Sequence, residues 1–362
     1  MKLEAYPAWL CLKTAPSLPL KACLELLRYY PDPSEFVGVA AHPVYSGGML
    51  KADTAQHLKV GVLPDNIAQI QQCMRHDEIS CLSILEYPAR LSEIFAPPLL
   101  LYLKGDLEAA LKQAALAVVG TRKPSAYGRE MCKKLLPKVV DSGVSIISGL
   151  ALGIDTEAHT VAVQRSAFTV GVLASGLNSI YPPQNLELSR KITAHGALVS
   201  EYEPYSKPER WNFPARNRII SALSDAVFVV EGPISSGALL TAKSAIDQNR
   251  DIAALPGNIN NINAEGPNHL IRNGAALISK AEDLLEILGL ESQNSAQTEI
   301  SFLLSAGEQK ICDLLKIEQR SLSFDELFAK SGFNAGKLST TLTNLELKGL
   351  IAKDSGNTFI LI

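Results

Sequence analysis

The sequence predicts an α/β protein in which helices cover both faces of a mainly parallel sheet. Six short apolar runs separated by helix-like stretches lead to this prediction; they are Leu116–Gly120, Val144–Ser148, Thr169–Leu173, Ala197–Ser200, Ala226–Val230 and Ile252–Leu255. Each run is continuously apolar rather than alternating, which is typical of strands buried on both faces. Parallel strands of this kind gather ligands beyond their carboxyl ends, so the loops after these runs are candidate sites.

The composition predicts a cytoplasmic protein with two or three domains. The chain has 362 residues, of which 47% are hydrophobic and 20% charged, enough for one large core with smaller units. Its formal net charge of -3 does not suit a protein that coats nucleic acid through overall charge, so any such site has to be local. The six cysteines form no C-x-x-C pair and no histidine stands at metal spacing, so reduced thiols and no metal are expected. No run of about 18 apolar residues is present, so no membrane span is expected.

The chain divides into three predicted domains and a linker. Residues 1–85 carry leucines and aromatics at helical spacing, which predicts a small helical domain. Residues 86–290 hold the sheet, and the polar stretch 291–300 suits a linker. Residues 301–362 predict three helices and a hairpin that turns at 355–357, which is the outline of a winged helix.

The last predicted helix of this third domain has two distinct faces. Its inner stripe is Leu338, Leu342 and Leu345, and its outer face is Lys337, Thr341, Asn344 and Lys348. The outer face suits a DNA recognition helix. Lys and Arg balance Asp and Glu between residues 301 and 362, however, and this zero net charge favours contact with a protein.

Two strand ends offer groups that bind anions. Gly120 lets a ligand approach the backbone, and Arg122 offers a planar guanidinium to phosphate oxygens; the alternative is a solvated surface arginine. Ser236 and Gly237 begin a predicted helix whose first N–H groups form a ready anion site. Neither loop fits the G-x-x-x-x-G-K-[ST] or the G-x-G-x-x-G pattern, so no nucleotide cofactor is predicted.

A second polar group follows the strand that ends at Ser148 and Gly149. Asp155 is expected to cap the helix that carries His159. Two interpretations are open, since the pair is either an ordinary cap with a packed histidine or part of a ligand site. No serine or cysteine nucleophile accompanies them, so no catalytic residue is predicted. The loop at Tyr181 is expected to be rigid and is best explained as a turn without function.

The segment 207–218 alternates cations with aromatic rings. Its members are Lys207, Arg210, Trp211, Phe213, Arg216 and Arg218. Single-stranded nucleic acid binds such mixtures because cations follow the phosphates while a ring stacks on a base.

Structural explanations of the same segment are also open. The two rings belong to the core in one of them, and Arg216 bridges Glu201 or Glu231 in another. Asn217 carries a donor and an acceptor in one amide, and it either fixes the loop or reads a base edge.

Taken in chain order, these motifs closely resemble those of the DprA/Smf DNA-processing proteins. The motifs are Gly120-Thr-Arg122, Ser148 to Asp155 with His159, Gly176 with Tyr181-Pro182, Ser200-Glu-Tyr202, Phe213 to Arg218, Glu231 with Ser236-Gly237 and Thr241-Ala242, and Pro256-Gly257. They extend over about residues 86 to 280. The resemblance implies an extended Rossmann-like core, preceded by a sterile-alpha-motif-like helical domain and followed by a winged helix.

The resemblance also implies a function. A member of this family is expected to be a homodimer without enzymatic activity that binds and protects incoming single-stranded DNA and loads the recombinase RecA onto it during natural transformation. The implied DNA contacts are Gly120, Arg122, Ser148, Gly149, Arg210, Phe213, Arg216, Asn217, Arg218, Ser236 and Gly237. The implied supporting residues of the cleft are Asp155, His159, Glu201, Glu231 and Thr241. The implied dimer surface contains His269, Leu270, Leu277 and Ile278.

The sharpest hypothesis concerns one ring and its neighbours. Phe213 stacks on a base, while Arg122, Arg210 and one of the paired arginines hold its phosphates. Two other functions compete with strand binding. A nucleotide phosphoribohydrolase on a related fold would resemble P-G-G-x-G-T, but here Asn258 follows Pro256-Gly257, and only Glu231 is left as a candidate acid. The second competing function is that of a winged-helix transcription regulator, and the neutral terminal domain argues against it.

Overall fold

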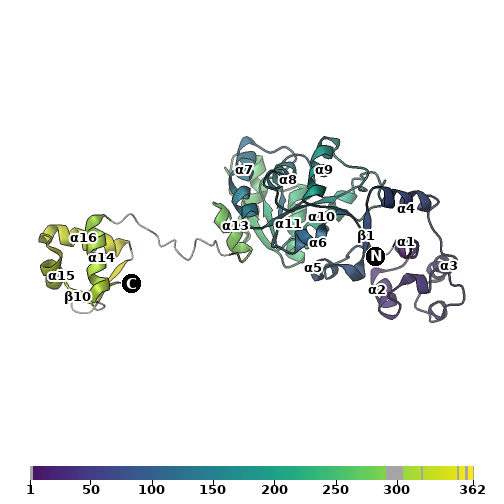
Figure 1. The fold of residues 1–362 in the computed structure, drawn as a ribbon, viewed down its shortest axis with the longest axis horizontal. Helices are drawn as coiled ribbons and strands as arrows, with labels where there is room; N and C mark the ends of the chain where they lie inside the picture. The colour runs from purple at the N-terminus through teal and green to yellow at the C-terminus, as the bar shows by residue number, and fades with distance from the viewer. Residues whose placement is uncertain (1–2, 291–304, 319–320, 349, 355–357, 362) are drawn as a thin grey trace. The chain divides into compact units, whose positions relative to one another are not determined.

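The protein consists of two compact units, residues 1–290 and 291–362 (Figure 1). The computed structural model describes residues 3–290, 305–318, 321–348, 350–354 and 358–361. None of the helices in these stretches is long and apolar enough to cross a membrane.

The first unit is built around a nine-stranded sheet of order β1-β2-β6-β5-β4-β3-β7-β8-β9. The strands are β1 Ser80–Ser83, β2 Leu100–Gly105, β3 Ala115–Val119, β4 Ser145–Ser148, β5 Thr169–Leu173, β6 Gly196–Ser200, β7 Ala226–Val229, β8 Asp251–Ala254 and β9 Ala276–Leu277. All neighbours from β6 to β9 in this order pair in parallel, whereas β1 and β2 are antiparallel additions at one edge. The predicted mainly parallel sheet is confirmed, and the six apolar runs coincide with β3 to β8 to within one residue.

Both faces of the sheet are buried, as the continuous apolar runs predict. Along β3, Leu116 and Val118 belong to one hydrophobic cluster, and Ala117 and Val119 belong to the other. Alternate side chains of a strand point to opposite faces, so each face needs its own cover. Three helices contribute to the first cluster: α7 Ala126–Asp141, α8 Ile154–Gln164 and α13 Ala281–Ile287. Two contribute to the second: α10 Asn212–Ala222 and α11 Gly237–Asp247.

The helices of this unit connect the strands and cover the sheet. They are α1 Tyr6–Thr14, α2 Leu20–Tyr29, α3 Ala52–Val60, α4 Ile67–His76, α5 Ala89–Ser92, α6 Leu107–Leu111, α7 Ala126–Asp141, α8 Ile154–Gln164, α9 Leu186–Ala194, α10 Asn212–Ala222, α11 Gly237–Asp247, α12 Ile262–Arg272 and α13 Ala281–Ile287. Short 3-10 helices are η1 Pro33–Glu35, η2 Pro43–Tyr45, η3 Ile84–Glu86 and η4 Pro183–Asn185.

The N-terminal helices share the core of the sheet. The hydroxyl of Tyr6 in α1 lies 2.8 Å from that of Tyr102 in β2, and both side chains are fully buried. The sheet itself begins at Ser80, before the expected start of the core at residue 86. Residues 1–290 therefore form one compact unit, and the separate helical domain over 1–85 stays a prediction.

The second unit has the order of a winged helix. Its elements are α14 Ala306–Glu318, β10 Leu322–Ser323, α15 Phe324–Ser331, α16 Ala335–Leu347, β11 Ile351–Asp354 and β12 Thr358–Leu361, with strand order β10-β12-β11. The predicted inner stripe of α16 is buried. The predicted linker 291–300 and the turn at 355–357 lie outside the described residues.

The outer face expected on α16 is only half exposed. Thr341 is buried and donates its hydroxyl to the carbonyl of Lys337, and Lys348 forms an ion pair with Glu308 at 2.7 Å. Lys337 and Asn344 are exposed. The predicted four-residue recognition face is therefore wrong, because Thr341 is buried and bonded within its own helix and Lys348 is paired with Glu308.

Candidate functional site

The predicted site residues meet in a cleft at the carboxyl ends of β3, β4 and β7. We call this hollow the strand-end cleft; the predicted residues that line it are Gly120, Arg122, Asp155, Phe213, Arg216, Asn217, Ser236, Gly237 and Thr241. The loop after β3, the N-termini of α8 and α11 and the first turns of α10 supply them. Parallel strands bring these distant segments together because their carboxyl ends share one edge of the sheet.

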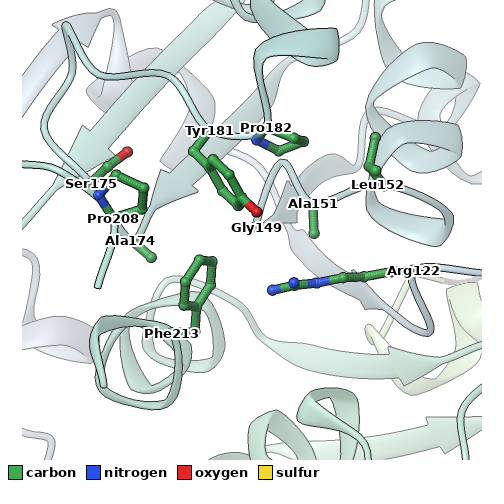
Figure 2. A pocket seen from close by; sticks show the side chains of 10 residues that line it. All are labelled: Arg122, Gly149, Ala151, Leu152, Ala174, Ser175, Tyr181, Pro182, Pro208 and Phe213. Carbon is green, nitrogen blue, oxygen red and sulfur yellow. The ribbon is translucent and has the colours of Figure 1, made fainter. Parts of the chain in front are cut away.

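A smaller side pocket adjoins this cleft, and Arg122 and Phe213 line both (Figure 2). The side pocket is lined by Arg122, Gly149, Ala151, Leu152, Ala174, Ser175, Tyr181, Pro182, Pro208 and Phe213. Figure 2 shows the side chains of Arg122, Tyr181 and Phe213 pointing toward one another.

Phe213 lies between a cation and a second ring. The guanidinium carbon of Arg122 is 5.0 Å from the centroid of the Phe213 ring, and the Tyr181 ring meets it edge-on with centroids 6.0 Å apart. Both contacts are favourable, because a cation is attracted to the ring face and an edge-on pair suits the ring quadrupoles. Phe213 is half-buried and Trp211 is 72% exposed, so the interpretation of both rings as core is wrong.

Tyr181 is the aromatic member of the site that sequence reasoning missed. The sequence predicts a turn without function for its loop, yet its ring forms a wall of the side pocket. The available signal was an aromatic next to two prolines in a loop at a strand end, where backbone stiffness keeps a ring in place.

Arg216 is buried at the bottom of the strand-end cleft. Its Nη1 donates to the carbonyl oxygens of Gly149, at 2.7 Å, and Val172. The predicted bridge to Glu201 or Glu231 is therefore wrong, because backbone carbonyl oxygens accept the hydrogen bonds of the guanidinium instead. Burial lowers the pKa of Arg216 to about 10, and the nearby carboxylate of Asp155 opposes that shift.

Asp155 holds the loop before its helix rather than capping the helix. It is the second residue of α8, and Gly153 occupies the N-cap position. Its Oδ2 accepts from the backbone N–H groups of Gly149 at 3.1 Å and Ala151 at 3.3 Å. Burial raises the pKa of Asp155, and the positive charge of Arg216 opposes this rise. The predicted cap is thus wrong, and Asp155 lies at the wall of the strand-end cleft.

His159 is a packed histidine. It is fully buried, and its Nδ1 lies 2.7 Å from the hydroxyl of Thr169, which donates in turn to the carbonyl of Ile146. Burial, together with the positive charge of Arg216, lowers the pKa of His159 to about 3, so the ring is neutral near pH 7. The structure therefore favours the first of the two interpretations.

Two further predicted residues have structural partners. Arg218 forms a bidentate ion pair with Glu201, with Nη2 at 2.9 and 2.8 Å from the two carboxylate oxygens, and donates from Nε to the carbonyl of Ala96. Glu231 is buried and accepts from the backbone N–H of Ser125, the N-cap of α7. The guanidinium groups of Arg216 and Arg218 thus both bind other groups of the protein.

Four cations around the site are exposed. They are Arg122 and Lys123 after β3 and Lys207 and Arg210 before α10. In the part of the chain that the structure describes, none of the four forms an ion pair. Their charge is therefore available to an anionic ligand.

The start of α11 adds backbone donors to the cleft. Ser236 is the N-cap and Gly237 the first residue of this helix, so its first N–H groups lack intrahelical partners. The amide of Asn217 donates to the carbonyl of Gly237 at 3.1 Å, and Thr241 donates to the same carbonyl. Asn217 fixes the start of α11 to α10, as the first of its two interpretations states.

The expected dimer surface is exposed only in part. His269 and Leu277 are exposed, whereas Leu270 and Ile278 are buried. Leu277 belongs to β9, the edge strand of the sheet. All six cysteines are buried and unpaired, and no group of three His, Cys, Asp or Glu in the described stretches could hold a metal ion.

The comparison with known protein families decides the classification. The family described as DNA recombination-mediator protein A matches residues 78–289, and the DprA winged helix domain matches residues 295–357. The chain belongs to the DprA/Smf family. The resemblance read from the motifs is confirmed, and the match begins eight residues before the predicted core and includes β1.

Individual DprA/Smf relatives match over most of their length. The chain is 39% identical to the DNA processing protein DprA of Bacillus subtilis over 249 residues, which is 66% of this chain and 84% of that protein. It is 37% identical to the protein Smf of Escherichia coli over 276 residues, which is 75% of this chain and 74% of that protein.

Solved DprA structures have the same fold. DprA from Streptococcus pneumoniae superposes with a TM-score of 0.65 at 32% identity, over 78% of this chain and 96% of that one. DprA from Helicobacter pylori, in a structure concerned with its single-stranded DNA binding mode, superposes with a TM-score of 0.54 at 30% identity, over 59% of this chain and 96% of that one. The predicted Rossmann-like core and winged helix are thereby confirmed.

Proposed function

We propose that this protein binds single-stranded DNA in the strand-end cleft and the side pocket. The observation that carries the proposal is the partly exposed ring of Phe213 among cations that have no carboxylate partner in the described residues. A ring of this kind stacks on a base while the cations neutralise the neighbouring phosphates. The Helicobacter pylori relative, whose structure concerns single-stranded DNA binding, supports the same ligand class.

In this proposal the phosphates of the strand contact exposed cations and the backbone N–H groups at the start of α11. Arg122 and Arg210 are exposed and form no ion pair in the described residues. The first backbone N–H groups of α11, which follow Ser236, lie at a helix N-terminus and attract anions. Arg216 and Arg218, by contrast, are engaged by backbone carbonyls and by Glu201. The paired arginines therefore stabilise the site, and the strand is held by the groups around them.

The wider role follows from family membership. We propose that the protein is a cytoplasmic homodimer without enzymatic activity that protects incoming single strands and loads RecA onto them in natural transformation. The family description as a recombination mediator supports this role. Glu231, the candidate acid of a phosphoribohydrolase, is buried and accepts from the N-terminus of α7, which supports a structural role for this carboxylate instead.

Anisotropy titration of a labelled oligothymidylate tests the site. Arg122→Ala should weaken binding and reduce the slope of log K against log salt by about 0.7, the value for one lost phosphate contact on a single strand. Phe213→Ala should weaken binding by about 1 to 3 kcal/mol and leave that slope unchanged, because it removes a stacked base.

The matched control is Arg165→Ala. Arg165 is also a surface arginine, but it follows the C-terminus of α8 and pairs with Asp141. Its loss should leave affinity and salt dependence as in the wild type. If Arg122→Ala and Phe213→Ala also bind like the wild type, the cleft is not the strand site.

The mediator role needs a separate assay. Single-stranded DNA covered by single-strand binding protein resists RecA filament formation, and this protein should shorten the delay before RecA hydrolyses ATP. Phe213→Ala should lose that effect together with strand affinity. A wild-type protein that binds strands and leaves the delay unchanged would restrict the function to protection.

A further inference from the structure

Trp211 is a large ring in solvent beside the proposed site. It is one of two tryptophans in the chain, and it is 72% exposed, whereas Trp9 is 3% exposed. It is the N-cap residue of α10 and stands two positions before Phe213. Exposed tryptophan is common where one face of the ring contacts a ligand.

The backbone that carries Trp211 is fixed by its neighbour. Asn212 is buried, and its side-chain amide donates to the carbonyl of Ala174 at 3.0 Å. Its backbone N–H donates to the carbonyl of Glu209 at 3.0 Å, and the hydroxyl of Tyr202 reaches its carbonyl. Asn212 thus anchors the chain between the two rings, and a ring on a fixed backbone loses little freedom when it binds.

The charges next to Trp211 suit a strand of nucleic acid. Lys207 and Arg210 are exposed and form no ion pair within the described stretches, and Glu209 is the single acidic residue between them. A base on Trp211 would therefore have cations within reach of its phosphates. A docking protein would need to supply acidic groups at this spot, whereas a strand carries them on every nucleotide.

We propose that Trp211 stacks on a second base of the same strand, next to the base on Phe213. The inference rests on the proposed function and extends it, because the site then accepts at least two bases, one on each side of the Asn212 anchor. Stacking uses the π-face that all bases share, so this contact tolerates any sequence.

The intrinsic fluorescence of the full-length protein tests the stacking directly. Trp9 is buried among the N-terminal helices, so a change on adding oligothymidylate reports on Trp211. Oligothymidylate should quench the emission. An abasic oligomer of the same length carries the same phosphates and should leave the emission unchanged. Trp9→Phe should retain the quenching.

Affinity gives an independent measurement. Trp211→Ala should raise the Kd for oligothymidylate roughly 5- to 150-fold, the loss of one stacked base, and leave the Kd for the abasic oligomer unchanged. Trp211→Phe keeps a ring and should retain most of the affinity. The matched control is Phe95→Ala, because Phe95 is a 93% exposed ring on the loop before β2 and should not affect binding.

Two results would overturn the inference. The first is equal quenching by the abasic oligomer. The second is a Trp211→Ala protein that binds oligothymidylate as tightly as the wild type while Phe213→Ala binds weakly; the proposed function would then stand without a second stacked base. If Phe213→Ala and Arg122→Ala bind normally as well, both proposals fail together.

Discussion

At the scale of single residues, arginines that are close in the sequence have different roles. Arg216 is 5% exposed and bonded to backbone carbonyls, and Arg218 is paired with Glu201, whereas Arg210 is exposed. Side-chain type alone does not separate these roles, because the partners come from strands and loops far away in the chain. Removing each guanidinium should therefore affect different properties.

Arg216→Met should destabilise the fold. The buried carbonyl oxygens of Gly149 and Val172 would lose their donor, which costs about 1–3 kcal/mol, and the carboxylate of Asp155 would lose a nearby positive charge. Urea unfolding followed by circular dichroism measures the loss. Arg210→Ala is the control, since an exposed substitution should stay within about 0.5 kcal/mol of the wild type while it weakens strand binding. An Arg216→Met protein as stable as the wild type would contradict the assigned role.

The neutral, buried His159 should make stability fall below pH 6.5. Its folded pKa of about 3 lies below the ordinary 6.5, so between these values the unfolded chain binds a proton that the fold excludes. Stability from this group is complete above pH 6.5 and decreases by about 1.4 kcal/mol per pH unit as the pH falls toward 3. Burial raises the pKa of Asp155, so the contribution of Asp155 to stability changes with pH in the opposite direction.

Urea unfolding at pH 7, 6 and 5 isolates the contribution of the histidine, with the pH values chosen across its unfolded pKa of about 6.5. His159→Gln removes the titrating group, so its stability should depend less on pH than that of the wild type. His76→Gln serves as the control, because the side chain of His76 is 85% exposed. Equal pH slopes for the wild type and His159→Gln would show that His159 does not exclude a proton in the fold.

At the scale of elements, the loops after β3 and β4 interlock to form the cleft. The backbone N–H of Ile154, at the start of α8, donates to the carbonyl of Thr121 at 3.3 Å. Gly153, just before it, has φ 85° and ψ -125°, a conformation that is essentially restricted to glycine. The loop that carries Arg122 therefore depends on the absence of a side chain at position 153.

Gly153→Ala should weaken both the fold and the binding of DNA. A Cβ at this position would lie 2.3 Å from the carbonyl oxygen of Thr121 and 2.8 Å from the carbonyl carbon of Arg122. The backbone strain costs about 1–3 kcal/mol, and relief of the clash displaces Arg122. Thermal unfolding and oligothymidylate titration measure the two effects.

Gly143→Ala is a control that introduces the backbone strain of a positive φ without the steric clash of the added Cβ. Gly143 also has a φ of 85°, but the nearest atom to its added Cβ is the Gln113 Oε1 at 3.7 Å. This variant should lose about 1–2 kcal/mol of stability and bind DNA normally. If Gly153→Ala also binds normally, the position of Arg122 does not depend on this contact between loops.

The elements also show how far the sequence predicts the structure. Strands β3 to β8 follow from apolar runs, because a strand buried on both faces leaves a continuous signal. The apolar run at residues 99–103 also coincides with most of the antiparallel β2, whereas the edge strand β1 alternates exposed and buried residues and leaves no continuous run. Gly120, Arg122 and Phe213 meet because strand ends align, but the partners of Arg216 and the ring of Tyr181 depend on side-chain packing that no local pattern encodes.

At the scale of the whole molecule, the proposed strand site belongs entirely to the first compact unit. The residues that line its cleft lie between Val119 and Asn263, within residues 1–290. The second unit, 291–362, has its own hydrophobic cluster and no net charge over residues 301–362. A neutral domain adds little to binding through phosphates.

A protein that ends at residue 290 should therefore bind oligothymidylate like the full chain. Its affinity and its salt slope should both be unchanged, since the same phosphate contacts are made. A chain of residues 291–362 should give its own cooperative thermal transition and should not bind the oligomer. If the shortened protein binds more than about tenfold more weakly, a loss of about 1.4 kcal/mol, with a smaller salt slope, then the winged helix contacts the strand and Lys337 is the first residue to replace.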